Sequence, residues 1–130
     1  MNWENLPSTN TPVNATNLQK ITDSGSNTNG NYIKLQDGTL IQWGETSATT
    51  GTTSQSRGGC TVYASDEVSQ YFPVSFIDNN ASVMTQINGG YAALNFIYTI
   101  IASARVRITL VSTSSSYSRT IKWLAIGRWK

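Results

Sequence analysis

The sequence predicts an all-β fold, an antiparallel sandwich preceded by a short extended N-terminal segment. From residue 31 onward, apolar segments of strand length are separated by polar turns, and no segment has the 3.6-residue period of a helix. Asp37-Gly38, a dipeptide typical of tight hairpin turns, lies between two of these segments. Strands that follow one another without helices are typical of antiparallel sandwiches.

Composition and charge narrow the possible functions. The chain has 130 residues, which suffices for one domain with its own core. Only 12% of the residues are charged, against about 25% in ordinary soluble domains, and the net charge is +2. This charge is too small and too scattered to predict nucleic-acid binding. A surface rich in Ser, Thr, Asn and Gln suits a neutral polar ligand such as a sugar, or simply a β-rich exterior.

The apolar segments predict neither a signal peptide nor insertion into a membrane. Residues 1–10 lack a basic region followed by an apolar one. The longest apolar stretch, residues 91–104, is too short to span a bilayer and is interrupted by Asn95 and Thr99. If the protein acts outside cells, cell lysis or incorporation into a particle brings it there.

The cysteine and histidine content predicts no cofactor, no metal and no catalytic thiol. Cys60 is the only cysteine, and the chain has no histidine. A thiolate nucleophile needs an activating group, and a zinc site needs several sulfur or nitrogen ligands. We therefore expect Cys60 to be a small strand residue, and stability to come from packing, assembly or both.

Residues 1–30 differ from the rest and are expected to be a tether or docking segment, with the sandwich domain at residues 31–130. Pro7 and Pro12 keep their preceding neighbours extended. Residues 23–30 are rich in Ser, Asn and Gly, so we expect a flexible joint there.

The first pair of strands is expected at residues 31–44. If positions 37 and 38 form a two-residue loop, Leu35 faces Leu40 on one side of the sheet, and Tyr32 faces Trp43 on the other. A half-buried hairpin has one apolar face and one wet face. Here neither face is free of apolar residues.

Further elements are expected in chain order. Residues 46–59 are expected to form a long polar loop or ragged edge, 60–64 a short strand, and 81–89 and 91–102 longer strands. In the apolar segment 71–76, a proline restricts the chain to a sheet edge or the start of a strand.

Alternation assigns faces in the last two strands, at residues 105–111 and 120–130, which are joined by a hydroxyl-rich turn. The first strand alternates strictly, whereas the second has apolar residues on both faces. In the first strand, the side chains expected to point inward are Val106, Ile108 and Leu110. In the second, one face is expected to carry Ile121, Trp123 and Ala125, and the other Leu124 and Ile126.

Three places are apolar on both faces: the pair at 31–44, the strand at 95–102 and the final strand. A two-layer sandwich of one chain covers only one face of each sheet. An exposed apolar patch of that size is unusual on a monomer. We therefore expect a cyclic homo-oligomer, specifically a homotrimer, whose copies cover the second face.

Ordered motifs along the chain resemble a known family. WENLPSTNTPVNATNLQKI, at residues 3–21, resembles segments of tail proteins from phages and prophages of Gram-positive hosts. NGNYIKLQDGTLIQWG, YFPVSF and the terminal KWLAIGRWK are similar, in this order, to the C-terminal head domain of phage tail fibres, the gp53-like tail-fibre domain. The resemblance covers nearly the whole chain. It implies a sandwich of about six strands like that of H-type lectins, which form parallel trimers with sugar sites near the subunit boundaries.

The resemblance also implies a function. The domain would be the receptor-binding tip of a tail fibre in the virion, made in the host cytoplasm and acting outside cells. It would recognise host surface carbohydrate as a homotrimer and attach to other phage tail proteins through its N-terminal segment. The alternative is a structural trimeric knob or baseplate component that binds no ligand.

The same resemblance implies roles for particular residues. Aromatic residues of the motifs would serve the core or the subunit contact: Tyr32, Trp43, Phe76, Trp123 and Trp129. H-type lectins place a sugar-contacting aromatic just before the last strand, where this chain has Tyr117. Its ring face suits sugar C–H groups, and Ser115, Ser116 and Arg119 offer hydrogen bonds to hydroxyls.

Weaker candidates for the same ligand are Asn95, Arg57 and Tyr63. Lectin relatives often have a histidine or a second tryptophan near this loop, and this chain has neither there. An exposed tyrosine in a serine-rich turn without any ligand fits the same residues.

The acidic residues predict that the protein is not an enzyme. Glycoside hydrolysis needs two opposed carboxylates. Asp37 is committed to a turn, and the adjacent Asp66 and Glu67 point to opposite faces of a strand. Release of reducing sugar from a surface polymer would revive this alternative.

Overall fold

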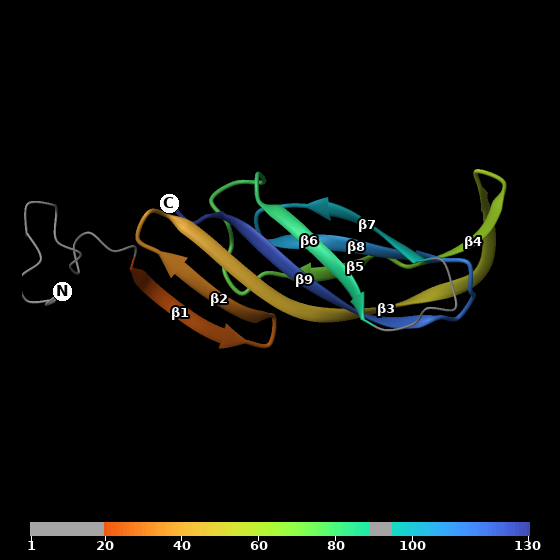
Figure 1. The fold of residues 1–130 in the computed structure, drawn as a ribbon, viewed down its shortest axis with the longest axis horizontal. Helices are drawn as coiled ribbons and strands as arrows, with labels where there is room; N and C mark the ends of the chain where they lie inside the picture. The colour runs from red at the N-terminus through yellow and green to blue at the C-terminus, as the bar shows by residue number, and fades with distance from the viewer. Residues whose placement is uncertain (1–19, 89–94) are drawn as a thin grey trace, which may run out of the picture.

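The fold is known from a computed structural model, which describes residues 20–88 and 95–130 (Figure 1). The described residues form nine strands and no helix, and every strand pairing among them is antiparallel. The predicted all-β antiparallel fold is confirmed, with nine strands where about six were expected. The strands are β1 (Ile21–Asn27), β2 (Gly30–Leu35), β3 (Thr39–Arg57), β4 (Cys60–Ser65), β5 (Val68–Tyr71), β6 (Ser82–Asn88), β7 (Asn95–Ile101), β8 (Arg105–Ser112) and β9 (Ser118–Arg128).

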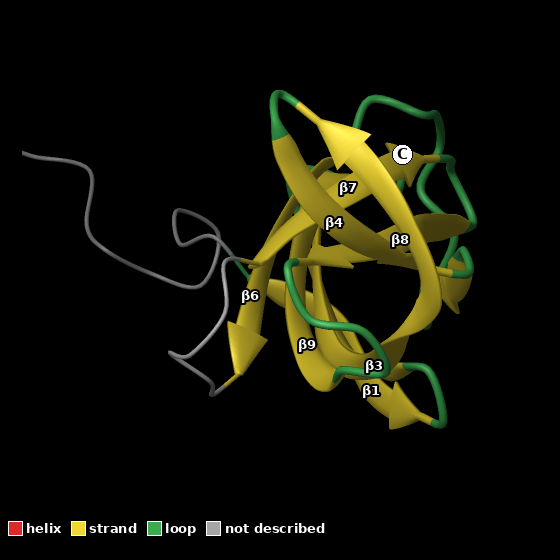
Figure 2. Ribbon diagram, turned by 90° about the vertical axis from the view of Figure 1, so that its right-hand side faces the viewer, coloured by secondary structure: helices red, strands yellow, loops and turns green. Residues whose placement is uncertain are grey.

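The long strand β3 joins two halves of one curled sheet. Its first part pairs with β2 and β9, and beyond them lie β1 and β6. Its last part pairs with β4, which leads to β8 and its neighbours β5 and β7. Figure 2 shows that the strands wrap around a common interior. The side chains that fill this interior come from both halves, as in a sandwich.

The core confirms the predicted faces of the last two strands. Ile108 and Leu110 of β8 and Ile121 of β9 are fully buried, as are Val106 and Ala125. Phe72 packs edge-on against Phe76 and Trp123, with ring centroids 5.0 and 5.6 Å apart. Each fully buried large apolar side chain stabilises the fold by about 1.5–3 kcal/mol relative to exposure.

The first hairpin has a loop of three residues, 36–38, so the predicted two-residue loop is wrong. Gly38 adopts a positive φ of 95°, and its N–H donates a hydrogen bond of 3.1 Å to the Leu35 carbonyl. A left-handed residue at the end of a three-residue loop is a common hairpin solution, and it adds one residue to the turn. The pairing therefore shifts by one position, and Lys34 faces Leu40.

This shift changes which residues of β2 lie opposite which residues of β3, and with them the side chains that share the core face. Tyr32 faces Gln42 rather than Trp43, because a one-residue slip exchanges the two faces of a strand. Gln42 is fully buried and makes two hydrogen bonds of 2.8 Å to the backbone of Val74, one donated and one accepted. Trp43 points away from the core and remains 38% exposed.

Two segments differ from their expected conformation. Residues 46–59, expected to be a loop or ragged edge, continue β3 as far as Arg57, because β9 and then β4 supply backbone partners. Residues 23–30, expected to be a flexible joint, form most of β1, its turn and the start of β2. Residues 1–19 of the predicted tether lie outside the described residues. The division of the chain at residue 30 therefore stays a prediction.

The segment 71–76 ends a strand instead of forming one. β5 stops at Tyr71, and the residues that follow form a loop held to β3 by Gln42. Phe72 and Phe76 point from this loop into the core. The expected start of a strand is therefore wrong, because the proline follows the end of β5, although β5 does lie at an edge of the sheet.

The side of the sheet opposite the core carries a second set of apolar side chains, which we term the outer face. Across the strands, Trp43 pairs with Leu124 and Leu124 with Met84. A parallel row contains Ile33, Ile41 and Ile126. Met84 is 55% exposed and Ile126 38%. The hairpin and the final strand are thus apolar on both faces, as the sequence predicted.

Candidate functional site

The loop that contains Tyr117 is held against the middle of β3. The N–H of Tyr117 donates a 2.9 Å hydrogen bond to Thr50 Oγ1, and the N–H of Thr50 donates to the Tyr117 carbonyl at 3.1 Å. Thr50 Oγ1 in turn donates to the Ser114 carbonyl at 2.7 Å. Since Thr50 is almost fully buried, these bonds fix the loop in one position.

The ring face that was expected to meet a sugar is covered by a neighbouring side chain. The Arg119 guanidinium carbon lies 3.7 Å from the centroid of the Tyr117 ring, and the ring packs against the core. Ser115 and Ser116 are exposed beside it. The structure therefore brings four predicted residues together, but the loop offers hydrogen-bonding groups more than an open aromatic surface.

The three weaker candidates lie on other strands and do not gather around the Tyr117 loop. Arg57 is exposed at the far end of the β3–β4 hairpin, seven residues along β3 from Thr50 and thus roughly 20 Å away. Tyr63 of β4 is half-buried and pairs with Ser112. The backbone of Asn95 pairs with Ser112 from the other side, whereas its side chain lies outside the described residues.

The five aromatic residues with expected structural roles separate into two groups. Phe76 and Trp123 are buried in the core of one chain, and Tyr32 and Trp129 pack against that core. The Trp129 indole N–H also donates to the Leu35 carbonyl at 3.0 Å. Trp43 alone of the five is exposed.

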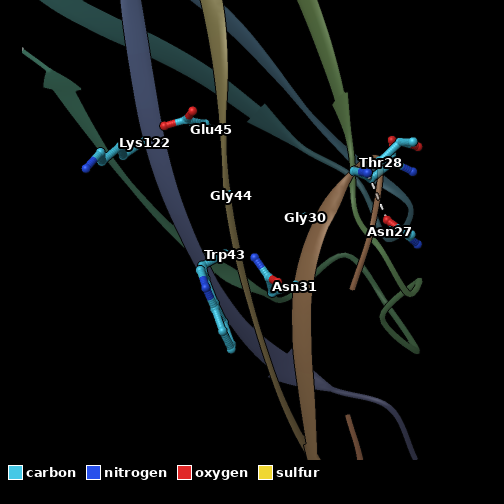
Figure 3. Close-up of a pocket in the computed structure, with 9 residues that line it drawn as sticks. Asn27, Thr28, Gly30, Asn31, Trp43, Gly44, Glu45 and Lys122 are labelled. Atoms are coloured by element: carbon cyan, nitrogen blue, oxygen red, sulfur yellow. Dashed lines mark hydrogen bonds between the residues drawn. The ribbon is translucent and has the colours of Figure 1, made fainter. Parts of the chain in front are cut away.

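A polar pocket that sequence reasoning missed lies beside Trp43 (Figure 3). Its volume is about 440 Å³. One wall is the β1–β2 turn, and the other is formed by β3 and β9. The lining residues are Asn27, Thr28, Asn29, Gly30, Asn31, Trp43, Gly44, Glu45 and Lys122.

Two glycines keep backbone close to the indole of Trp123 beneath this pocket. A Cβ at Gly44 would lie 2.9 Å from Trp123 Cζ2 and 3.1 Å from Cε2, the atom bonded to Nε1. Gly30 has a φ of 138°, and a Cβ there would lie 2.4 Å from the Trp43 carbonyl oxygen. Only glycine fits both positions without displacing its neighbours. Trp123 Nε1 is buried and has no hydrogen-bond partner within the described part of the chain.

The polar groups of the pocket are of two kinds. Asn27 is engaged, because its Oδ1 accepts the Asn29 N–H at 2.8 Å and its Nδ2 donates to the Pro73 carbonyl at 3.4 Å. Glu45 and Lys122 face each other across β3 and β9. Across residues 20–88 and 95–130, neither of them forms an ion pair. Their charges are therefore available to a ligand.

A second set of polar contacts stiffens the hairpin whose turn forms the pocket wall. Asp23 of β1 accepts a 3.2 Å hydrogen bond from the Tyr32 hydroxyl and lies 3.4 Å from the Lys34 ammonium. Partial burial, this hydrogen bond and the negative charge of Asp23 raise the pKa of Tyr32 above its ordinary value. The hydroxyl therefore remains a donor at neutral pH.

Residues 20–88 and 95–130 contain neither a cluster of metal ligands nor a membrane-spanning helix. No three His, Cys, Asp or Glu side chains lie close enough together there to hold a metal ion. None of these residues forms a helix long and apolar enough to cross a membrane.

One known protein family matches most of the chain. The model of the family "tail fiber protein gp53-like, C-terminal" matches residues 34–128. The chain belongs to this family. The resemblance seen in the motifs is thereby confirmed, and the protein is a tail fibre domain.

Solved structures with a similar fold include two pyocin fibres. An N-truncated R1-type pyocin tail fibre has a TM-score of 0.48 and 15% identity, covering 81% of this chain and 84% of that chain. A C-terminal part of the R1 pyocin fibre of P. aeruginosa has the same TM-score and identity, covering 81% of this chain and 28% of that one. The curated proteins searched contain no match.

The pocket of this tail fibre domain lies across the boundary of the family match. Trp43, Glu45 and Lys122 lie within residues 34–128, whereas the turn at residues 27–31 precedes them. One wall is thus part of the family scaffold, and the other belongs to a segment before it. The signals in the sequence were the Asn-Thr-Asn-Gly run, typical of a turn, and the apolar surplus around Trp43.

Proposed function

We propose that this tail fibre domain is the receptor-binding tip of its fibre, and that it recognises carbohydrate on the host cell surface as a homotrimer. The observation that carries the proposal is the polar character of one end of the molecule. The β3–β4 hairpin projects there, away from the C-terminus and the start of β1 (Figure 1). Residues 51–61 are all exposed and are mostly Ser, Thr, Gln and Gly. Such a surface suits uncharged, hydroxyl-rich ligands.

The Tyr117 loop supports the same proposal. Ser115 and Ser116 are exposed, and Arg119 is held flat over the Tyr117 ring. A guanidinium held in place loses little side-chain entropy when it donates hydrogen bonds to a ligand. We assign this loop, with Arg57, Tyr63 and Asn95 at greater distance, to the recognition surface.

The homotrimer is supported by the outer face. One apolar row crosses β3, β9 and β6, and the other crosses β2, β3 and β9. Three large side chains of this face are at least 38% exposed: Trp43, Met84 and Ile126. Copies of the chain that pack over Leu124, Met84 and the row of isoleucines would remove them from water, whereas Trp43, at the end of its row, would stay open to the pocket beside it. The segment before β1 would join the domain to other tail proteins in the virion.

Recognition of this kind needs no catalysis. Glu67 is committed to an ion pair with Arg107 at 3.3 Å, and Asp37 accepts the Thr39 N–H within the hairpin loop. With these contacts, we do not expect either carboxylate to serve as one of the two opposed acids that glycoside hydrolysis needs. The domain would therefore hold the fibre on its receptor, while cutting of the polymer, where it occurs, belongs to other proteins.

A purely structural knob is the second candidate, and one observation favours it. The Arg119 guanidinium covers the ring face of Tyr117 that a sugar would need. In a knob, this pair would simply rigidify the loop, and the fibre would recognise its host elsewhere.

An array of bacterial surface glycans, with the purified chain as analyte, tests the proposal. We expect saturable binding to at least one polysaccharide and the release of no reducing sugar. Asp78→Asn, an exposed change in the loop after β5, should leave binding unchanged. Absence of saturable binding to every glycan would favour the structural knob, and reducing-sugar release would indicate an enzyme.

A further inference from the structure

We infer that the pocket beside Trp43 is a binding site for a neutral pyranose sugar. The inference rests on the proposed carbohydrate recognition and places it at a site other than the Tyr117 loop. It is carried by an exposed indole, unpaired polar groups and a rigid floor that meet in one pocket.

Trp43 supplies the apolar surface that a sugar ring needs. Trp43 is 38% exposed and lines the pocket, whereas the ring of Tyr117 is covered by Arg119. Large aromatic side chains offer apolar contact with little loss of side-chain freedom. The C–H face of a pyranose can therefore lie against this indole.

The polar wall supplies hydrogen bonds to the hydroxyl groups. Within the described part of the chain, the side chains of Asn31, Glu45 and Lys122 have no hydrogen-bond or ion-pair partner. The carboxylate can accept from two adjacent hydroxyls, the ammonium donates, and the amide can do both. Figure 3 shows Asn31 beside Trp43, and Glu45 and Lys122 further along β3 and β9.

The charges favour an uncharged ligand. Glu45 and Lys122 lie directly opposite each other on neighbouring strands, so their side chains start from Cβ atoms about 5 Å apart. Their charges cancel over that distance. A sugar acid would be repelled by Glu45 as it is attracted by Lys122, whereas hydroxyl groups can use both.

The pocket is built before any ligand arrives. The hydrogen bonds of Asn27 fix the turn, and Gly30 and Gly44 rest on the edge of the buried Trp123 ring. A preformed site loses less affinity to ordering than a mobile loop does. Its volume of about 440 Å³ falls within the range of about 300–1,000 Å³ of small-molecule sites.

The test is a titration of the ¹⁵N-labelled full chain, followed by NMR. The probes are the methyl glycosides of glucose, galactose, mannose and N-acetylglucosamine, with methyl glucuronide as a charged comparison. We expect at least one neutral glycoside to cause saturable shifts of the Trp43 indole N–H and the Asn31 side-chain amide. Methyl glucuronide should bind more weakly.

Two variants locate the site. Asn31→Ala and Glu45→Gln should each weaken binding about tenfold or more, because each removes hydrogen bonds to the ligand. Asp78→Asn is the matched carboxylate-to-amide control in the exposed loop after β5 and should leave these affinities unchanged. Arg119→Ala tests the Tyr117 loop instead. Light scattering confirms that the variants keep the mass of the parent, so that a loss is not a loss of assembly.

The outcomes separate this inference from the proposed function. If glycosides bind but only Arg119→Ala weakens them, the Trp43 pocket is not the site, and carbohydrate recognition stands. Equal or tighter binding of the glucuronide overturns the neutral ligand class. If neither the glycosides nor the surface glycans bind, both the inference and the proposed recognition fail.

Discussion

Gln42 is a buried amide whose two hydrogen bonds to Val74 join β3 to the loop after β5. We expect Gln42→Ala to lower the free energy of unfolding by about 2–4 kcal/mol. The change removes both bonds and leaves the partly buried N–H and C=O of Val74 without these partners. Urea unfolding, monitored by tryptophan fluorescence, measures the difference.

Gln86→Ala on β6 is the matched control, because Gln86 is exposed. It should alter stability by no more than about 0.5 kcal/mol. If both variants were equally stable, the Gln42 contacts would not hold the loop in solution.

Single residues also mark the limit of what the sequence could predict about the site. Tyr117 was located correctly before the last strand, but its ring is covered by Arg119, two residues further on. Trp43 was assigned only a structural role, although it is exposed at a pocket. The pocket combines residues 27–31, 43–45 and 122, and this proximity depends on strand pairing that no local pattern reveals.

At the scale of elements, β3 contains a glycine beneath which the core leaves no space. We expect Gly44→Ala to destabilise the fold by about 1–3 kcal/mol, because the new Cβ would lie 2.9 Å from the Trp123 ring. Gly51→Ala in the same strand is the control, since its Cβ would meet only an ordinary contact of 3.4 Å. Thermal unfolding of the two variants measures the difference. Equal midpoints would mean that the Trp123 ring can move away.

Elements with strong alternation were predicted well, and the others were not. In β8 and β9 the buried residues have a period of two, which fixes both the strand and its faces. The last part of β3 is polar on both faces, so no period distinguishes it from a loop. The register of the first hairpin depends on one extra residue in its loop, which the Asp37-Gly38 signal does not specify.

At the scale of the whole molecule, one apolar surface of the sheet is buried within the chain and the other is exposed. The inner one is buried by the curled sheet itself, with Ile121 and Trp123 at its centre. The outer face, with Trp43, Leu124 and Ile126, stays on the surface of the single chain. Folding of the single chain therefore covers the inner surface, and we expect assembly to cover most of the outer one.

The outer face predicts the oligomeric state. The parent should have three times the mass of the 14.2 kDa chain by multi-angle light scattering at micromolar concentration. Ile126→Lys should shift this mass towards the monomer, because a charge buried between subunits without a partner is strongly unfavourable. Ile77→Lys is the control: Ile77 is 61% exposed but lies in the loop after β5 and not on a strand of the outer face. A monomeric parent, or dissociation by Ile77→Lys alone, would show that this face does not hold copies together.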